Sequence, residues 1–197
     1  MKNILSTLLF LLSINYCSAT TFTVSNLNDV GAGSLRQSIN AANADFSATP
    51  GGPHIINFTV SGTHFINSAL PVVNNHITFN GHAAGSTVTR GNLGSFYRVF
   101  EVKAFTVEMN NIKVETGNPG ASNPGGGILN EGGTLTMNNC IVEGNECGAA
   151  ALGHGGGIAQ NSGTLNINNS TIKNNDSGAN GQGGGIYIAD GTVTLTN

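Results

Sequence analysis

Three observations predict an all-β chain that coils as a right-handed parallel β-helix, with three short strands in each coil of 28–30 residues. Glycine makes up 29 of the 197 residues. A block that begins Gly-Gly-Gly-Ile occurs three times, and a short strand-like segment follows each block at the same distance. Apolar positions keep this spacing further upstream, where the glycines are absent. Repeats of this length are typical of solenoids, in which each coil contacts only its neighbours.

Residues 1–19 have the pattern of a secretory signal peptide. Lys2 supplies a positive charge, the stretch from Ile4 to Ile14 is mostly apolar, and small residues precede Thr20. The apolar stretch is shorter than the about 20 residues that a membrane-spanning helix needs. We therefore expect a chain that does not span a membrane and that is secreted or displayed at the outer surface of a cell.

Composition limits the classes of partner. Without Lys2, six basic and ten acidic residues remain, and charged residues are only 9% of the chain. This distribution offers no attraction to nucleic acid or to an anionic membrane. Carbohydrate, or a protein of a host or cell surface, remains as the expected partner.

Residues 20–68 predict an N-terminal cap and first coil, and residues 69–197 the repeats. The segments Thr21–Val24 and Ile55–Val60 have the pattern of strands. Ser34 is a favoured N-cap for a helix that starts at the next residue. A helix in front of a solenoid is expected to cover the open end of the first coil, since terminal repeats need a cap.

One face of this helix is expected to carry Leu35, Ile39, Ala42 and Phe46. Arg36 is expected to support the cap, with its stem packed and its guanidinium bonded to loop carbonyls. A functional role for Arg36 is the alternative.

Three columns of apolar residues define the repeats, with successive spacings of 30, 28, 30 and 28 residues. They consist of Leu70, Phe100, Ile128, Ile158 and Ile186; of Ile77, Val107, Leu135, Leu165 and Val193; and of Phe79, Met109, Met137, Ile167 and Leu195. The second and third columns alternate with polar residues, as in a strand with one buried face. Stacked coils would turn each column into an interior ladder, in which a buried side chain contributes roughly 1.5–3 kcal/mol before ordering entropy is subtracted.

Asparagines and glycines in the repeats are expected to be structural. Two asparagine columns end the second strand of the coil: Asn110, Asn138 and Asn168, and then Asn111, Asn139 and Asn169. Asn tolerates left-handed backbone at a bend, and stacked amides can bond from coil to coil. The Gly-Gly-Gly runs predict bends or close backbone approaches, because no Gly-x-x-x-x-Gly-Lys pattern accompanies them.

The segment Asn28–Ile39, with Gly-Ser-Leu-Arg-Gln at its centre, resembles the N-terminal signature of large secreted bacterial β-helix proteins. The repeats resemble those of polymorphic outer membrane proteins and related adhesins, which pair Gly-Gly-Ala-(Ile/Leu/Val/Tyr) with Phe-x-x-Asn. Here Gly126-Gly127-Ile128 has Gly in place of Ala, and Val142-Glu143-Gly144-Asn145 has an aliphatic residue in place of Phe. The resemblance covers Thr21–Asn197 and implies a bacterial protein of the secreted or outer-surface class, without fixing its function.

The acidic residues form no pattern typical of an enzyme. β-Helix enzymes that act on pectic polysaccharides need clustered carboxylates, or a calcium site with a basic residue as the base. Glu115 and Glu143 stack in the repeat register and Lys173 follows, which favours a solvated charge ladder over a calcium or sugar contact. No carboxylate pair recurs at the spacing of a glycosidase. We therefore predict no enzyme, no catalytic residue and no cofactor.

The histidines and cysteines predict no metal site. The five histidines are isolated, and His-x-x-x-His and Cys-x-x-Cys spacings are absent. Cys140 aligns with Ile112 and Ser170, which places it in the core, and Cys147 falls in the following turn. A disulfide between these two cysteines stays open.

The leading hypothesis is a secreted or cell-surface scaffold or adhesin module without catalysis. One alternative is a β-helix protein that binds or degrades polysaccharide. A second is an ice-binding solenoid, because the outward threonines of Thr134-x-Thr136 recur at Thr192-x-Thr194. Asn166 and Glu108 interrupt that array, so a regular threonine lattice is not predicted.

The chain stops at Asn197, partway through a coil. A coil edge presents unpaired backbone donors and acceptors, which natural solenoids cover. We therefore expect that the chain is the N-terminal fragment of a larger protein, or that it associates end to end with itself or frays in its last coil.

Overall fold

The computed structural model of the chain describes residues 19–50, 52–120, 123–148 and 153–197. Apart from Ala19, the predicted signal peptide lies outside the described residues. The described elements are β1 (Thr21–Val24), α1 (Leu35–Ala44), β2 (His54–Phe58), β3 (Gly62–Ile66), β4 (Ile77–Asn80), β5 (Ser86–Arg90), β6 (Phe100–Val102), β7 (Thr106–Asn110), β8 (Ile112–Glu115), β9 (Ile128–Asn138), β10 (Ile141–Glu143), β11 (Ile158–Asn168), β12 (Thr171–Lys173), β13 (Ile186–Ile188) and β14 (Thr192–Thr196).

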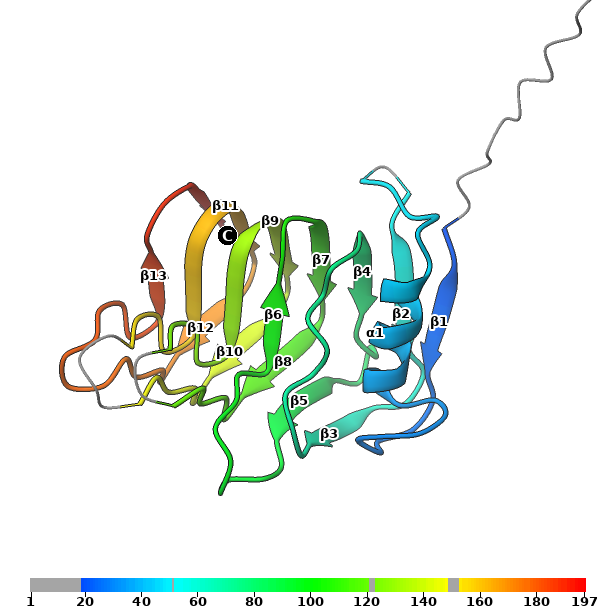
Figure 1. Cartoon of the computed structure of the whole chain (residues 1–197), viewed down its shortest axis with the longest axis horizontal. Coiled ribbons are helices and arrows are strands. Elements are labelled where there is room, and N and C mark those ends of the chain that lie inside the picture. Colours follow the sequence, from blue (N-terminus) through cyan, green and yellow to red (C-terminus); the bar gives the residue numbers. More distant parts are fainter. Residues whose placement is uncertain (1–18, 51, 121–122, 149–152) are drawn as a thin grey trace, which may run out of the picture.

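The strands form two parallel sheets that wind into a β-solenoid of about five turns (Figure 1). The larger sheet has nine strands and places β1, β2, β4, β7, β9, β11 and β13 in spatial order. In the same sheet β14 pairs with β11, and β6 pairs with β9. The smaller sheet contains β3, β5, β8, β10 and β12. The predicted all-β parallel solenoid with one short helix near its N-terminus is confirmed.

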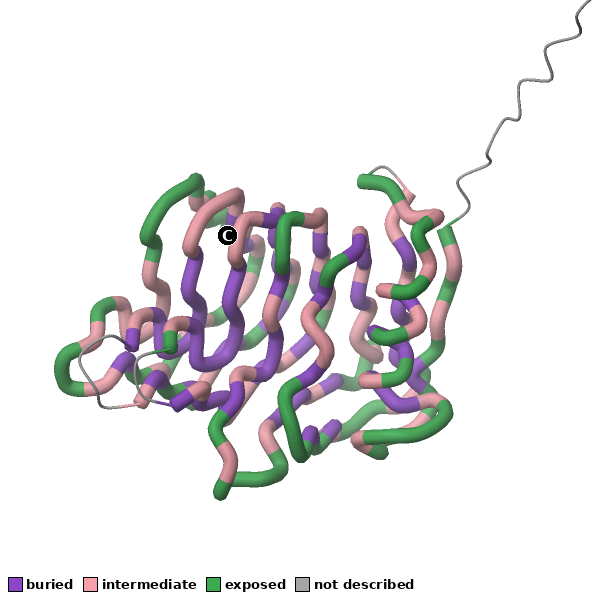
Figure 2. Tube along the Cα trace, viewed as in Figure 1, coloured by how far each residue is buried: buried purple, intermediate pink, exposed green. Residues whose placement is uncertain are grey.

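The second and third apolar columns are confirmed over all five coils. Their ladders join Ile77, Val107, Leu135, Leu165 and Val193, and Phe79, Met109, Met137, Ile167 and Leu195. All of these side chains are buried except Val193 and Leu195 in the last coil. The buried segments line up from coil to coil in Figure 2 and form the apolar core.

The first column is confirmed from Phe100 to Ile186 but not at its upstream end. Leu70 is buried, yet it lies outside the strands. The backbone bridge in that coil joins Val73 to Val102 instead. Residues 67–76 therefore run beside β6 without forming a strand.

The coils from β6 to β12 each have three strand positions, as predicted, but the first two positions merge in two of these coils. β9 and β11 each continue through eleven residues, whereas β6 and β7 are separate. Two buried amides mark the merger in β9: Asn130 Nδ2 donates to Gly133 O at 3.0 Å and to Gln160 Oε1 at 2.7 Å. These bonds give hydrogen-bond partners to the buried side-chain amide of Asn130 and to the buried Oε1 of Gln160.

The predicted corner chemistry is also confirmed. Asn111, Asn139 and Asn169 have φ values of 57°, 52° and 46°, in the left-handed region that Asn tolerates. They turn the chain from the larger sheet into the smaller one. In the Gly-Gly-Gly runs, a Cβ added at Gly156 would lie 2.3 Å from Asp176 O, so only glycine permits this backbone approach.

Helix α1 joins the first coil through Leu35, Ile39 and Ala42, which are buried. Ser34 caps it as predicted, and its side chain accepts from Gln37 N. The prediction for Phe46 is wrong. The backbone is already extended at Asp45, which breaks the helical spacing, and Phe46 is exposed. No helix among the described residues has the length and apolarity to cross a membrane.

Arg36 connects α1 to the following coil. Its guanidinium donates to Ser68 O at 2.8 Å and Ala69 O at 2.5 Å, and it pairs with Asp29 at 2.7 Å. Asn43 Nδ2 donates to Val72 O at 2.7 Å. These bonds place the helix beside residues 67–76, where later coils have their first strand. The predicted carbonyl contacts of Arg36 are confirmed, and the covering of the open end by α1 stays a prediction.

Two coils upstream extend the third column with irregular spacing. Phe22 pairs with Ile56 and Ile56 with Phe79, at separations of 34 and 23 residues. The helix and loop between β1 and β2 lengthen the first of these coils. The third column therefore continues through two coils upstream of the part of the chain in which the sequence repeats regularly.

Candidate functional site

The outer surface of the larger sheet carries a regular array of polar side chains, here called the Thr/Asn face. Its three columns are Thr106, Thr134, Thr164 and Thr192; Thr78, Glu108, Thr136, Asn166 and Thr194; and Asn80, Asn110, Asn138, Asn168 and Thr196. Neighbours are about 4.8 Å apart along a column and about 7 Å apart along a strand. All of these side chains are partly or fully exposed, and Glu108 is the single ionisable one among them.

The asparagines of this face are fixed by their own amides. Asn110 Nδ2 donates to Asn80 Oδ1 at 2.9 Å, Asn138 Nδ2 to Asn110 Oδ1 at 2.8 Å, and Asn168 Nδ2 to Asn138 Oδ1 at 2.8 Å. Asn138 Nδ2 also donates to Glu108 Oε1 at 2.9 Å. The amides therefore share one orientation, and the coil-to-coil bonds expected of stacked asparagines are confirmed.

The first column of the Thr/Asn face has free hydroxyl groups. Thr106 pairs in register with Thr134, Thr134 with Thr164, and Thr164 with Thr192. Within the described ranges, no hydrogen bond joins these hydroxyls to another residue. The sequence prediction considered Thr-x-Thr pairs along a strand and missed this unbroken column across the coils.

The charged column predicted from the repeats lies on the smaller sheet. Glu143 pairs in register with Glu115 and with Lys173. Lys113 Nζ lies 2.6 Å from the carboxylates of both Glu115 and Glu143, and Lys173 Nζ lies 3.0 Å from Glu143. The two lysines hold the pKa of Glu143 below its usual range, and the two carboxylates raise the pKa of Lys113. Lys113, which was not singled out in the sequence, makes the column a charge ladder.

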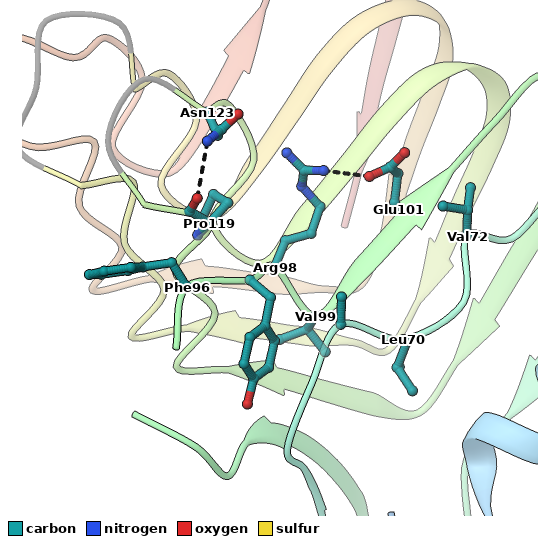
Figure 3. A pocket seen from close by; sticks show the side chains of 10 residues that line it. Leu70, Val72, Phe96, Arg98, Val99, Glu101, Pro119 and Asn123 are labelled. Carbon is teal, nitrogen blue, oxygen red and sulfur yellow. Dashed lines mark hydrogen bonds and ion pairs between the residues drawn. The ribbon is translucent and has the colours of Figure 1, made fainter. Parts of the chain in front are cut away.

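A groove of about 270 Å³ lies between residues 69–72, the segment 96–101 and the side chains of Pro119 and Asn123 (Figure 3). Arg98 and Glu101 form its polar side, and Leu70 and Val72 contribute apolar surface. The groove lies where residues 67–76 run past β6 without forming a strand. No sequence motif marks the groove, because it depends on contact between segments of successive coils, which lie about 30 residues apart in the chain.

Arg98 is fixed by backbone carbonyls of the neighbouring coil. Its Nε donates to Gly125 O at 3.4 Å and its Nη2 to Pro124 O at 3.1 Å, while Nη1 donates to the Glu101 carboxylate. These bonds use three of the five N–H groups of a guanidinium. These three bonds fix the guanidinium of Arg98 at the polar side of the groove.

Phe96 lies at the opposite side of the groove from Val72 (Figure 3). It packs over Gly120, where a Cβ would lie 3.2 Å from Phe96 Cβ, and Gly120 has φ of 83°. The next residue, Tyr97, donates its hydroxyl to Ile66 O at 2.8 Å. The loop that carries Phe96 is therefore held by its contact with Gly120 and by the hydrogen bond from Tyr97 to Ile66.

The cysteines singled out in the sequence are both buried, and no disulfide joins them. Cys140 lies in the core, as predicted from its alignment with Ile112. Burial raises the pKa of the Cys147 thiol to about 11. Across the described parts of the chain, no group of three or more His, Cys, Asp or Glu residues could hold a metal ion.

Comparison of the chain with protein-family models, with curated proteins and with solved structures gave no match. The architecture itself therefore defines the class: a parallel β-solenoid with a Thr/Asn face on one sheet, a charge ladder on the other and a groove at the side.

Proposed function

We propose that the chain is a secreted or cell-surface scaffold or adhesin module that binds a repetitive, uncharged surface through its Thr/Asn face and catalyses no reaction. The observation that carries the proposal is the face itself, with neutral hydrogen-bonding groups repeated at the coil spacing. Weak contacts in a periodic array bind tightly together, because each contact raises the effective concentration of the next. Polysaccharide and the outer surface of a cell are partners of this kind.

The location and family expected for the chain support the same proposal. Secretion rests on the pattern of residues 1–19, and an outer-surface role agrees with the resemblance to polymorphic outer membrane proteins. The low share of charged residues, 9%, favours a partner that is not recruited by charge.

The environment of the carboxylates supports a non-catalytic role. Acid–base catalysis needs titratable groups whose environments separate their pKa values within reach of one substrate. Glu115 and Glu143 are instead both bound by Lys113. Asp45 accepts from the Thr20 hydroxyl, which lowers the pKa of Asp45 to about 2. The lowered pKa values of Glu143 and Asp45 favour their ionised forms, whose bonds join neighbouring segments of the solenoid.

Retention on insoluble polysaccharides and whole cells tests the proposal. The double variant Thr134→Arg/Thr164→Arg puts two charges in the middle of the Thr/Asn face and leaves the core intact, because both side chains point outward. The matched control Thr63→Arg/Thr87→Arg makes the same change at paired positions of the smaller sheet. We expect cellulose, chitin or cells to retain the wild type and the control, and the face variant to bind about tenfold more weakly or worse.

Equal retention of the two variants would contradict binding through the Thr/Asn face. The absence of catalysis is tested separately with pectin and alginate, with and without calcium. We expect no release of reducing or unsaturated sugar. Turnover that Glu115→Gln or Glu143→Gln abolishes would overturn the non-catalytic role.

Ice binding is a second candidate, and the unbroken column from Thr106 to Thr192 favours it. A fixed repeat of hydroxyl and methyl groups can match a crystal lattice. Glu108 and Asn166 interrupt the neighbouring column and weigh against this candidate. Inhibition of ice recrystallisation by the wild type, lost in Thr134→Arg/Thr164→Arg, would establish it, and the absence of inhibition would exclude it.

A further inference from the structure

The groove beside β6 combines an exposed aromatic ring with a fixed pair of polar side chains. Phe96 is 68% exposed although its loop is held by Gly120 and Tyr97. A single exposed apolar side chain is common on protein surfaces, and what distinguishes Phe96 is its position at a groove that also holds a fixed ion pair. We propose that this groove binds one ring of a neutral saccharide, a function separate from that of the Thr/Asn face.

The size and shape of the groove suit one sugar ring. Its volume of about 270 Å³ is just below the range of about 300–1,000 Å³ found for pockets of drug-sized ligands. A pyranose has a face of C–H groups, which can stack on an aromatic ring, and an edge of hydroxyl groups. Phe96 offers the aromatic surface, and Arg98 with Glu101 offers the polar one.

The charges at the groove favour a neutral ligand. Glu101 is bound by Arg98 and by Lys103 at 3.4 Å, and Lys103 also pairs with Glu131. Two positive and two negative side chains therefore cancel, and nothing attracts a uronic acid or a phosphate. A sugar hydroxyl both donates and accepts, so it can donate to the carboxylate and accept from the guanidinium.

Binding would require little rearrangement of the protein. The three bonds of Arg98 to Glu101, Pro124 and Gly125 already fix its guanidinium. A fixed side chain loses little conformational entropy when it takes up a ligand. A single ring makes few contacts, so we expect a dissociation constant in about the millimolar range.

The test is an NMR titration of the purified, isotope-labelled 197-residue chain. The probes are the methyl glycosides of glucose, galactose, mannose and N-acetylglucosamine, with galacturonic acid as the charged comparison. We expect at least one neutral glycoside to shift the signals of Arg98 Nε–H and the Gly120 amide in a saturable way. Phe96→Ala should weaken this binding about tenfold, because it removes the stacking surface.

Phe65→Ala is the matched control, because Phe65 is also an exposed phenylalanine but does not line the groove. Its affinity should equal that of the wild type. The proposal would be overturned by neutral glycosides that leave the Arg98 and Gly120 signals unchanged, by equal affinities of the Phe96→Ala and Phe65→Ala variants, or by tighter binding of galacturonic acid than of every neutral probe. The Thr134→Arg/Thr164→Arg variant should keep groove binding, which separates this site from the Thr/Asn face.

Discussion

The middle coils and the first two coils build the same ladder by different means. From β7 to β12, aliphatic residues and Met fill the core columns and the spacing is that of the repeat. From β1 to β4, a helix replaces a strand, the spacing changes to 34 and then 23 residues, and histidines enter the core. The column of Val88, Val114 and Val142 begins with His64.

This difference shows two ways to fix the register of a parallel sheet. In the middle coils, repeated side chains define the register, since a slip of one residue would place polar residues in the core. In the first coils, individual bonds from side chain to backbone define it, as from Arg36 to Ser68 and from Asn75 to Ala42. The middle coils should therefore be sensitive to core substitutions, and the first coils to the loss of single polar groups.

The largest expected effect is a break in a core column of the middle coils. Leu165→Asp buries a carboxylate where Leu165 lies between Leu135 and Val193. We expect a loss of about 3–5 kcal/mol or more in the free energy of unfolding. Thr164→Asp, one residue away and outward, should change it by less than about 1 kcal/mol. Urea denaturation followed by circular dichroism measures both, and equal losses would contradict the assigned faces of β11.

The next effect concerns the polar bonds of the first coils. Arg36→Ala removes donors to Ser68 O and Ala69 O and leaves Asp29 without its ion-pair partner, although Asn67 N still donates to it. We expect a loss of about 1–3 kcal/mol in the same denaturation experiment. Lys113→Ala, in the more exposed charge ladder, should cost about 1 kcal/mol or less. A larger loss for Lys113→Ala than for Arg36→Ala would reverse the comparison.

A smaller effect is expected within the Thr/Asn face. Asn138→Ala interrupts the amide ladder, which removes bonds to Asn110 and Glu108 and the bond from Asn168. The expected loss is about 1–2 kcal/mol. Asn166→Ala removes one bond of 3.3 Å to Thr136 Oγ1 and should cost less. If thermal unfolding gave the same midpoint for both variants, the amide ladder would contribute nothing beyond a single bond.

The smallest effect is a dependence on pH that arises in the first coils. Burial lowers the pKa of His64, which has no hydrogen-bond partner in the described structure. Below the ordinary value of 6.5 the unfolded chain binds more protons at this residue than the folded chain does. Stability should therefore be complete above about pH 6.5 and should fall as the pH drops below it. The measurement is the melting temperature as a function of pH. His64→Leu should reduce the fall in melting temperature below about pH 6.5, and an unchanged fall would mean that other groups cause the pH dependence.

The sequence predicted the middle coils well because their columns repeat. Leu135, Leu165 and the corner asparagines appear at fixed spacing, so local patterns and the global fold agree. The helix at Leu35 was also predictable from its N-cap, whereas its position beside residues 67–76 was not. That position depends on bonds between segments with no shared pattern.

The candidate surfaces were only partly predictable. The outward positions of Thr134 and Thr136 follow from strand alternation, but the continuous threonine column requires the register of every coil. The groove was not predictable. Arg98 and Phe96 lie in an irregular segment, and the groove depends on the missing strand at residues 67–76.

The parallel ladders also have a mechanical consequence. Hydrogen bonds between coils run along the solenoid axis, so tension along that axis opens one coil at a time and loads few bonds at once. A coil of 28–30 residues released in this way would lengthen the chain by about 100 Å. The middle coils would therefore yield in nearly equal steps. A module with this arrangement could extend stepwise under shear while its remaining coils stayed folded.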